Sequence, residues 1–161
     1  MNRKLWCGNF KCIHCQYYVV GESLVSGVTH RNHCPYCLWS RHLDLHKAGD
    51  RLAACRSPMQ PVGLTLKRSH NKYGTRSGEL MLVHLCVECG RISINRIAAD
   101  DDPDTILRVF TDSFELDQGF IDRIEASGIK ILQQPDHWLV RMRLYGRNSS
   151  FLSLGIESLI P

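Results

Sequence analysis

The sequence lacks any apolar run long enough to cross a membrane. Runs such as residues 17–20 and 80–83 are far shorter than the ~20 residues that a spanning helix needs. No apolar segment follows the basic residues near the N-terminus, so a secretory leader is not predicted. The first 21 residues hold no acidic side chain, as in many transit peptides, but cleavage there would remove the first cysteine pair. We therefore expect a cytoplasmic protein with no membrane partner.

Motifs for nucleotide chemistry and for common hydrolases are also missing. The 12 glycines are dispersed, so the sequence has neither a phosphate loop nor a dinucleotide-binding fingerprint. It has no H-E-x-x-H motif and no Ser-His-Asp set. We expect no nucleotide cofactor. Hydrophobic residues make up 43% of the chain and charged residues 22%, which is an ordinary globular composition.

Cysteine, by contrast, is abundant, with eight residues in a chain of 161. Six of them form three C-x-x-C pairs: Cys12/Cys15, Cys34/Cys37 and Cys86/Cys89. The first two pairs are 18 residues apart, a spacing typical of a zinc ribbon, and they predict one tetrahedral zinc site. A disulfide framework is not favoured without an export signal. Thioredoxin-type redox pairs are an alternative, but such a pair needs to begin a helix.

The third pair predicts a second zinc site. Residues 62–68 and 79–87 have the pattern of two paired strands, which would bring Cys55 close to Cys86 and Cys89. For the fourth ligand we prefer His84, because it lies two residues before Cys86 and so leaves the same face of a strand. Cys7 is the main alternative, since eight thiols divide into two sets of four, and His42 is another.

The pattern of the whole chain predicts an α+β fold, with a zinc-ribbon-like module of short strands followed by a small α+β tail. We place the zinc-binding domain at residues 1–102 and the C-terminal extension at 103–161. Asp102 and Pro103 predict the start of a helix that runs through Phe110. A second helix is expected over 117–127 and ends at Gly128. Short strands are expected over 16–20, 38–46, 91–97 and 129–132, and the alternation in 137–145 predicts a last one.

The net charge of +4 conceals a separation of charge along the chain. Residues 1–99 hold 14 basic and 5 acidic side chains, a net charge of +9, whereas residues 100–125 hold 2 basic and 9 acidic ones, a net charge of −7. Zinc changes these values because ligating cysteines are thiolates. With one Zn(Cys)4 and one Zn(Cys)3His site, the first segment falls to about +6 and the whole chain to about +1.

Residues 31–35 read R-N-H-C-P, and with 36–40 they resemble the RNHCP family of small bacterial proteins. The resemblance continues through S-x-H-x-D at 40–44, G-D-R at 49–51, Cys55, M-x-P at 59–61, H-x-C-x-x-C-G at 84–90 and N-R-x-A-x-D-D at 95–101. The resemblance implies two structural zinc sites, on Cys12, Cys15, Cys34, Cys37, Cys55, His84, Cys86 and Cys89. It implies no reaction.

Three functions are compatible with these features. We favour a structural zinc module that binds RNA on the ribosome through residues beside the cysteine turns: Arg31, Asn32, Arg41, Arg91, Asn95 and Arg96. A protein-interaction adaptor that uses the acidic segment 100–125 is the second possibility. The third is a zinc-dependent hydrolase, in which His42, Asp44 and His46 would share one face of a strand and hold a catalytic metal.

Overall fold

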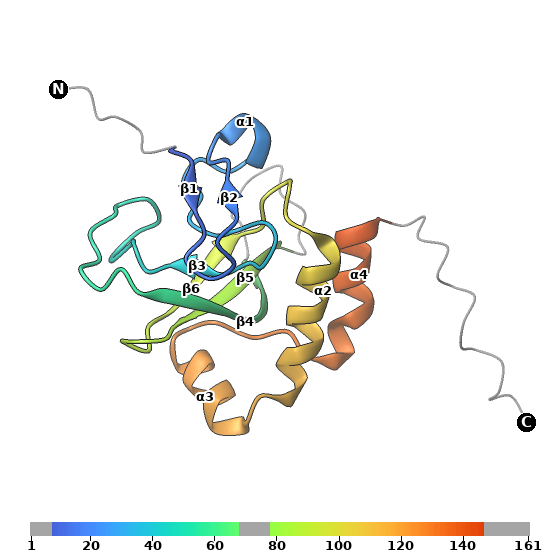
Figure 1. The fold of residues 1–161 in the computed structure, drawn as a ribbon. Coiled ribbons are helices and arrows are strands. Elements are labelled where there is room, and N and C mark those ends of the chain that lie inside the picture. Colours follow the sequence, from blue (N-terminus) through green and yellow to red (C-terminus); the bar gives the residue numbers. More distant parts are fainter. Residues whose placement is uncertain (1–7, 68–77, 147–161) are drawn as a thin grey trace, which may run out of the picture.

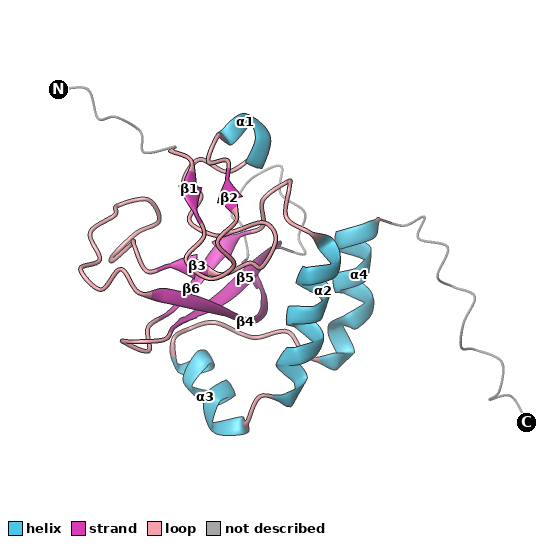
Figure 2. Ribbon diagram, viewed as in Figure 1, coloured by secondary structure: helices cyan, strands magenta, loops and turns pink. Residues whose placement is uncertain are grey.

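A computed structural model describes residues 8–67 and 78–146 of the chain (Figure 1). Within them, a short N-terminal ribbon and one short helix precede a four-stranded sheet, and the longer helices follow the sheet (Figure 2). The strands are β1 (Phe10–Lys11), β2 (Tyr18–Val19), β3 (Ser40–Arg41), β4 (Pro58–Lys67), β5 (Glu79–Cys86) and β6 (Ile92–Arg96). The helices are α1 (Ser23–Ser26), α2 (Pro103–Asp112), α3 (Gln118–Ala126) and α4 (His137–Tyr145), with single 3-10 turns at Ser113–Glu115 and Gln134–Asp136. The predicted α+β class is confirmed.

Both sheets are antiparallel. β1 pairs with β2, and the larger sheet has the order β3-β4-β5-β6. The predicted hairpin of β4 and β5 is confirmed, while its turn at 68–77 lies outside the described residues. The register of β4 shifts between Pro61 and Gly63, and such a bulge changes the face toward which neighbouring side chains point. Val62 and Leu64 therefore enter different core clusters.

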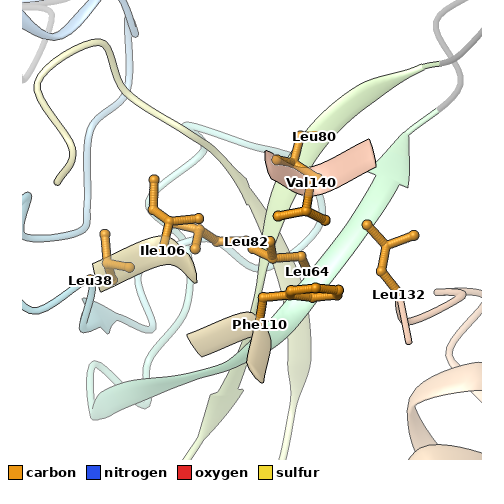
Figure 3. Close-up of a cluster of buried hydrophobic side chains, with 8 residues drawn as sticks. All are labelled: Leu38, Leu64, Leu80, Leu82, Ile106, Phe110, Leu132 and Val140. Atoms are coloured by element: carbon orange, nitrogen blue, oxygen red, sulfur yellow. The ribbon is translucent and has the colours of Figure 1, made fainter. Parts of the chain in front are cut away.

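Helices cover both faces of the central strands. One cluster joins Leu64 and Leu82 of the sheet to Phe110 of α2 and Val140 of α4 (Figure 3). The other joins Val62 and Val83 to Ile124 of α3. β5 is buried along almost its whole length because it is covered on both sides, which explains its nearly continuous apolar sequence. The core thus combines side chains from before and after residue 102.

The two predicted helices begin where their caps indicate. The Asp102 side chain accepts a hydrogen bond from the Thr105 backbone N–H at 3.0 Å, and Pro103 occupies the first turn of α2. The Asp117 side chain caps α3 in the same way through Phe120, at 2.9 Å. The chain leaves α3 through Gly128, which has a φ of +79°.

The predicted strand over 137–145 is wrong, because this segment is helix α4. Apolar residues at every second position suggested a strand, but Val140 and Leu144 are also four residues apart and reach the same cluster. Trp138 breaks the alternation, since it is 67% exposed. A capping box between Gln133 and Asp136 starts the helical turn, and this signal in the sequence was missed.

Two further predicted strands are shorter than expected. In 38–46 only Ser40 and Arg41 pair, at the edge of the sheet beside β4. In 129–132 only Ile131 makes a bridge, with Thr65, although the Leu132 N–H also donates to the Leu64 carbonyl at 2.8 Å. These contacts hold the segment along β4 without forming a strand.

Candidate zinc sites and the surface beside them

Each of the three C-x-x-C pairs closes the same backbone turn. The N–H of the first cysteine donates to the carbonyl five residues ahead: Cys12 to Tyr17 (2.8 Å), Cys34 to Trp39 (2.9 Å) and Cys86 to Arg91 (2.8 Å). Its own carbonyl accepts from the N–H four residues ahead: Gln16 (3.1 Å), Leu38 (2.9 Å) and Gly90 (3.0 Å). We call these turns knuckles 1, 2 and 3. Their common hydrogen bonds turn both sulfurs of a pair toward one point.

The residue that ends each knuckle adopts a left-handed conformation. Gln16, Leu38 and Gly90 have φ values of 65°, 60° and 69°. This conformation costs a non-glycine residue about 1–2 kcal/mol, so only knuckle 3 forms without that cost. For Leu38 the burial of its side chain, which is fully enclosed in the first core cluster, offsets this conformational cost. Knuckle 2 is therefore held by the core as well as by its own hydrogen bonds.

Knuckles 1 and 2 place four cysteines around one point. Cys12, Cys15, Cys34 and Cys37 have sulfurs that all lie within 4.8 Å of one another. The Cys12–Cys37 and Cys15–Cys34 separations are 3.6 Å and 3.5 Å. Tetrahedral zinc with Zn–S bonds of ~2.3 Å needs sulfur separations of about 3.8 Å, whereas a disulfide needs about 2.05 Å. The geometry matches a Zn(Cys)4 site, and this predicted ligand set is the one the structure assembles.

Without metal, the two cysteines of knuckle 2 favour the thiol over the thiolate. Burial raises the pKa of Cys34 to about 11, and burial also raises the pKa of Cys37 well above its ordinary value. Four thiolates packed this closely would repel one another without a cation. Zinc supplies that charge and fits these donors, so binding would release protons from the buried thiols.

A second group consists of His42, Cys55, Cys86 and Cys89, which again offer four ligand atoms within 4.8 Å. The Cys55 and Cys86 sulfurs are 3.7 Å apart, and His42 Nδ1 lies 3.3 Å from the Cys89 sulfur. His42 follows β3, Cys55 precedes β4, and knuckle 3 joins β5 to β6. Hydrogen bonding from Ser57 and His42 lowers the pKa of Cys55 to about 6, which favours the thiolate that a metal requires.

The preference for His84 as the fourth ligand was wrong. His84 Nε2 donates to the Leu38 carbonyl at 2.7 Å, and its Nδ1 accepts from the Asn95 amide at 3.0 Å, so neither nitrogen has a lone pair left for a metal. Burial lowers the pKa of His84 to about 3 and keeps the ring neutral. Cys7, the other alternative, lies outside the described residues.

His42→Ala and His84→Ala separate the two assignments. We expect His42→Ala to lower the zinc content from two ions per chain to about one, because it removes a ligand. We expect His84→Ala to keep two ions and to lose about 1–3 kcal/mol of stability from its unpaired hydrogen-bond partners. Zinc analysis of protein purified under reducing conditions measures the difference. A zinc loss in His84→Ala alone would contradict our assignment.

The R-N-H-C-P segment is tied to the chain just before α2. Arg31 Nη1 lies 2.7 Å from each carboxylate oxygen of Asp100, and Arg31 Nη2 lies 3.0 Å from Asp101 Oδ1. His33 Nε2 lies 2.8 Å from Asp101, which also accepts the Ala98 N–H at 2.7 Å. The side chains of Arg31 and Asp101 are fully buried. The proposed role of Arg31 at an RNA phosphate is thus corrected: this guanidinium is an internal ion-pair partner, and its acidic partners were not anticipated.

The other predicted RNA-binding residues differ in their availability. Arg41 is exposed, and Asn32 is half-buried. Arg91 is exposed, but one nitrogen donates to the Leu45 carbonyl at 2.6 Å. Asn95 is bound to His84, and Arg96 pairs with Glu79 at 2.7 Å. Of the six, Arg41 and Asn32 are the residues whose side chains have no hydrogen-bond or ion-pair partner among the described residues.

The structure does not assemble the residues of the predicted catalytic metal site. His42 turns toward the cysteines, Asp44 accepts the backbone N–H groups of Gly49 and Arg51, and His46 is exposed. Within 8–67 and 78–146, the two four-ligand groups are the clusters that could hold a metal. Both contain four protein ligands, and closed sites of this kind are structural.

These observations define a structural zinc protein with two closed sites on an α+β fold. Comparison with known families matches the RNHCP domain over residues 7–107. The chain therefore belongs to the RNHCP domain family, as its motifs suggested. Comparison with curated proteins found no match, and comparison with solved structures found none either. No helix in the described part of the chain is long and apolar enough to span a bilayer.

Proposed function

We propose that this zinc module binds single-stranded RNA on the surface formed by knuckles 1 and 2, β1 and the segment around β3. Ribosomal RNA is the partner that we propose. The observation that carries the proposal is a set of exposed cations without internal partners. Lys11, Arg41 and Arg56 have no hydrogen bond or ion pair from their side chains within the described ranges.

Unpaired cations are the groups that a phosphate backbone can use without first breaking another interaction. Arg31 and Arg96 do not meet this condition, since each already has a carboxylate partner. Arginine suits this role because its planar fork can donate two hydrogen bonds to one phosphate. Lys11 and Arg56 were not among the predicted residues, because only the fold brings them near Arg41.

Exposed tyrosines at the first two knuckles add a second kind of contact. Tyr17, Tyr18 and Tyr36 are 64%, 63% and 57% exposed. The rings of Tyr17 and Tyr36 lie 5.3 Å apart, so knuckles 1 and 2 present a joint aromatic surface. Unpaired bases stack on such side chains, and each base contributes roughly 1–3 kcal/mol. Duplex nucleic acid offers no free base faces, which is why the proposal specifies single strands.

RNA binding through these residues should depend strongly on salt. If Lys11, Arg41 and Arg56 each contact one phosphate of a labelled single-stranded oligoribonucleotide, raising salt from about 50 to about 200 mM should weaken binding roughly 20-fold. Replacing all three with glutamine should remove most of this dependence in a fluorescence anisotropy titration. The matched control changes Arg96, Arg108 and Arg123 to glutamine, which alters net charge equally on other elements. The proposal would be refuted if both triple variants lost RNA affinity equally, or if the unaltered protein bound no RNA at all.

The ribosomal partner and the cytoplasmic location are parts of the same proposal. Free thiols that serve as zinc ligands require a reducing compartment, which supports the cytoplasm. Sedimentation of a native lysate, followed by sequencing of RNA cross-linked to the protein, tests the ribosome directly. A protein partner for residues 100–125 is the weaker proposal. Asp100, Asp101 and Asp102 already bind within the chain, and the apolar faces of α2 and α3 pack on the sheet.

A further inference from the structure

A hollow of about 400 Å³ opens beside zinc ligand Cys12. Its walls come from residues 8–13 around β1, from 31–32 before knuckle 2, from 39–41 and Leu43 around β3, and from Arg51 and Arg56. In Figure 1 the β1–β2 ribbon stands over β3 at this place, with the loop from β3 to β4 at its side. The volume lies near the lower end of the roughly 300–1,000 Å³ typical of small-molecule sites. One nucleotide is a suitable occupant, and a helix or a folded domain is not.

The charge of this hollow favours an anion. Lys11, Arg41, Arg51 and Arg56 line it, and none of its lining residues is acidic. Arg31 also borders it, but Asp100 and Asp101 neutralise that guanidinium. Asp44 lies 3.8 Å from Arg51, and zinc on four thiolates carries a charge of −2, so both reduce the local positive charge. Lys11, Arg41 and Arg56 have no acidic partner among the described residues.

Arg51 has a buried donor that makes no hydrogen bond. Its Nη1 forms an ion pair with Asp44 at 3.8 Å, which is too long for a hydrogen bond, and it donates to no other described residue. Its Nη2 donates to the Arg31 carbonyl at 3.2 Å, which fixes the guanidinium at the wall of the hollow. A buried donor of this kind costs free energy until an acceptor reaches it, and a phosphate oxygen is such an acceptor.

Asn32 supplies a group that can recognise a base. In the R-N-H-C-P segment, Arg31 and His33 bind aspartates, Cys34 is a zinc ligand, and Pro35 is buried. The Asn32 carbonyl accepts hydrogen bonds from Ser40 and Arg41, but its side-chain amide borders the hollow without a partner in the described structure. An amide offers both a donor and an acceptor, and so matches the edge of a nucleobase.

Trp39 adds a flat apolar wall. Its ring stacks on His14, with centroids 4.2 Å apart and planes 3° from parallel, which holds the indole in one orientation. The same residue lines the hollow. A fixed aromatic wall favours a planar ligand over a simple inorganic anion.

We propose that this hollow binds one unstacked nucleotide of an RNA strand, with the base at Asn32 and Trp39 and the phosphate at Arg41, Arg51 and Arg56. This inference rests on the proposed function and specifies its binding site. An unstacked nucleotide presents both its base edge and its phosphate, which a base inside a duplex cannot do. Neighbouring bases of the strand would then reach the exposed tyrosines of knuckles 1 and 2.

The test is a titration of zinc-loaded, ¹⁵N-labelled full-length protein with each of the four nucleoside 5′-monophosphates, followed by NMR. We expect the signals of the Asn32 side-chain amide and the Trp39 indole N–H to shift together. Inorganic phosphate and ribose 5-phosphate should move the Arg51 signals but leave these two in place. Asn32→Leu retains a similar side-chain volume without the amide, and should weaken mononucleotide binding at least tenfold. Gln60→Leu, at an exposed position of β4 outside the hollow, is the matched control.

The outcomes distinguish this inference from the proposed function. If oligoribonucleotides bind in a salt-dependent way while mononucleotides leave Asn32 and Trp39 unchanged, the hollow is not the nucleotide site and RNA binding stands. Equal shifts with phosphate and with mononucleotides would reduce the hollow to an anion site and overturn the inference. If neither ligand binds, both proposals fail. The NMR titration of the unaltered protein decides the question even if Asn32→Leu does not fold.

Discussion

Replacing Cys34 with serine should remove one of two zinc ions and unfold the structure around knuckles 1 and 2. Cys34 is fully buried, and its sulfur lies 3.5 Å from that of Cys15 in the first ligand group. Serine is a poor zinc ligand, and structural zinc typically contributes about 10–16 kcal/mol of binding free energy to folding. In most cases this binding free energy is larger than the total free energy of unfolding of a domain, which is about 5–15 kcal/mol. The predicted change is therefore loss of fold rather than a small shift in melting temperature.

Metal analysis and circular dichroism with heating measure both parts of this prediction. Cys7→Ser is the matched control, since the two ligand groups are complete without Cys7, and it should keep two zinc ions and the melting temperature of the unaltered chain. If Cys34→Ser kept two zinc ions and an unchanged melting temperature, the pairing of knuckles 1 and 2 around one ion would be wrong.

The second large effect concerns the buried ion pairs of Asp101. Asp101→Ala would leave Arg31 Nη2, His33 Nε2 and the Ala98 N–H without their common acceptor. Asp100 would still bind Arg31, but its side chain is 30% exposed and does not reach the other two donors. Breaking one member of a buried ion pair typically costs about 3–5 kcal/mol, because the remaining charge stays in a medium of low polarity. We expect a loss of that size in urea unfolding.

Glu79→Gln provides the comparison, because it breaks an ion pair at the surface. Glu79 and Arg96 are 2.7 Å apart, but their side chains are 37% and 61% exposed. Pairs of this kind contribute about 0–1 kcal/mol, so the urea midpoint should move little. A similar small change for Asp101→Ala would show that the R-N-H-C-P segment is not anchored by this aspartate.

Local patterns explain which features were predictable from the sequence. A C-x-x-C pair closes its own turn within six residues, so the three knuckles follow from spacing alone. The starts of α2 and α3 depend on a cap and its partner three residues later, which are also adjacent in sequence. The hairpin of β4 and β5 was evident because both strands are long and apolar.

The errors arose where the deciding contact is distant in sequence. His84 and His42 are both near a knuckle, and only the packing of β5 against Leu38 decides which ring faces the cysteines. Arg31 has a charge that suggests a phosphate, but its partners follow about 70 residues later. Burial of a charged residue cannot be inferred from its type. For α4, the alternation of apolar and polar residues over nine positions fits both a strand and a helix. The helix forms because it packs Val140 and Leu144 into the first core cluster.

Leu38 has a consequence for how the chain could be divided. It ends knuckle 2, and its side chain packs with Leu82 of β5 and with Ile106 and Phe110 of α2. A fragment truncated before α2 would leave that side of the sheet uncovered next to a zinc ligand turn. If only the cysteine turns were grafted onto another scaffold, that scaffold would also need apolar side chains to bury Leu38. For protein engineering, the smallest portable unit thus includes α2 together with the metal-binding turns.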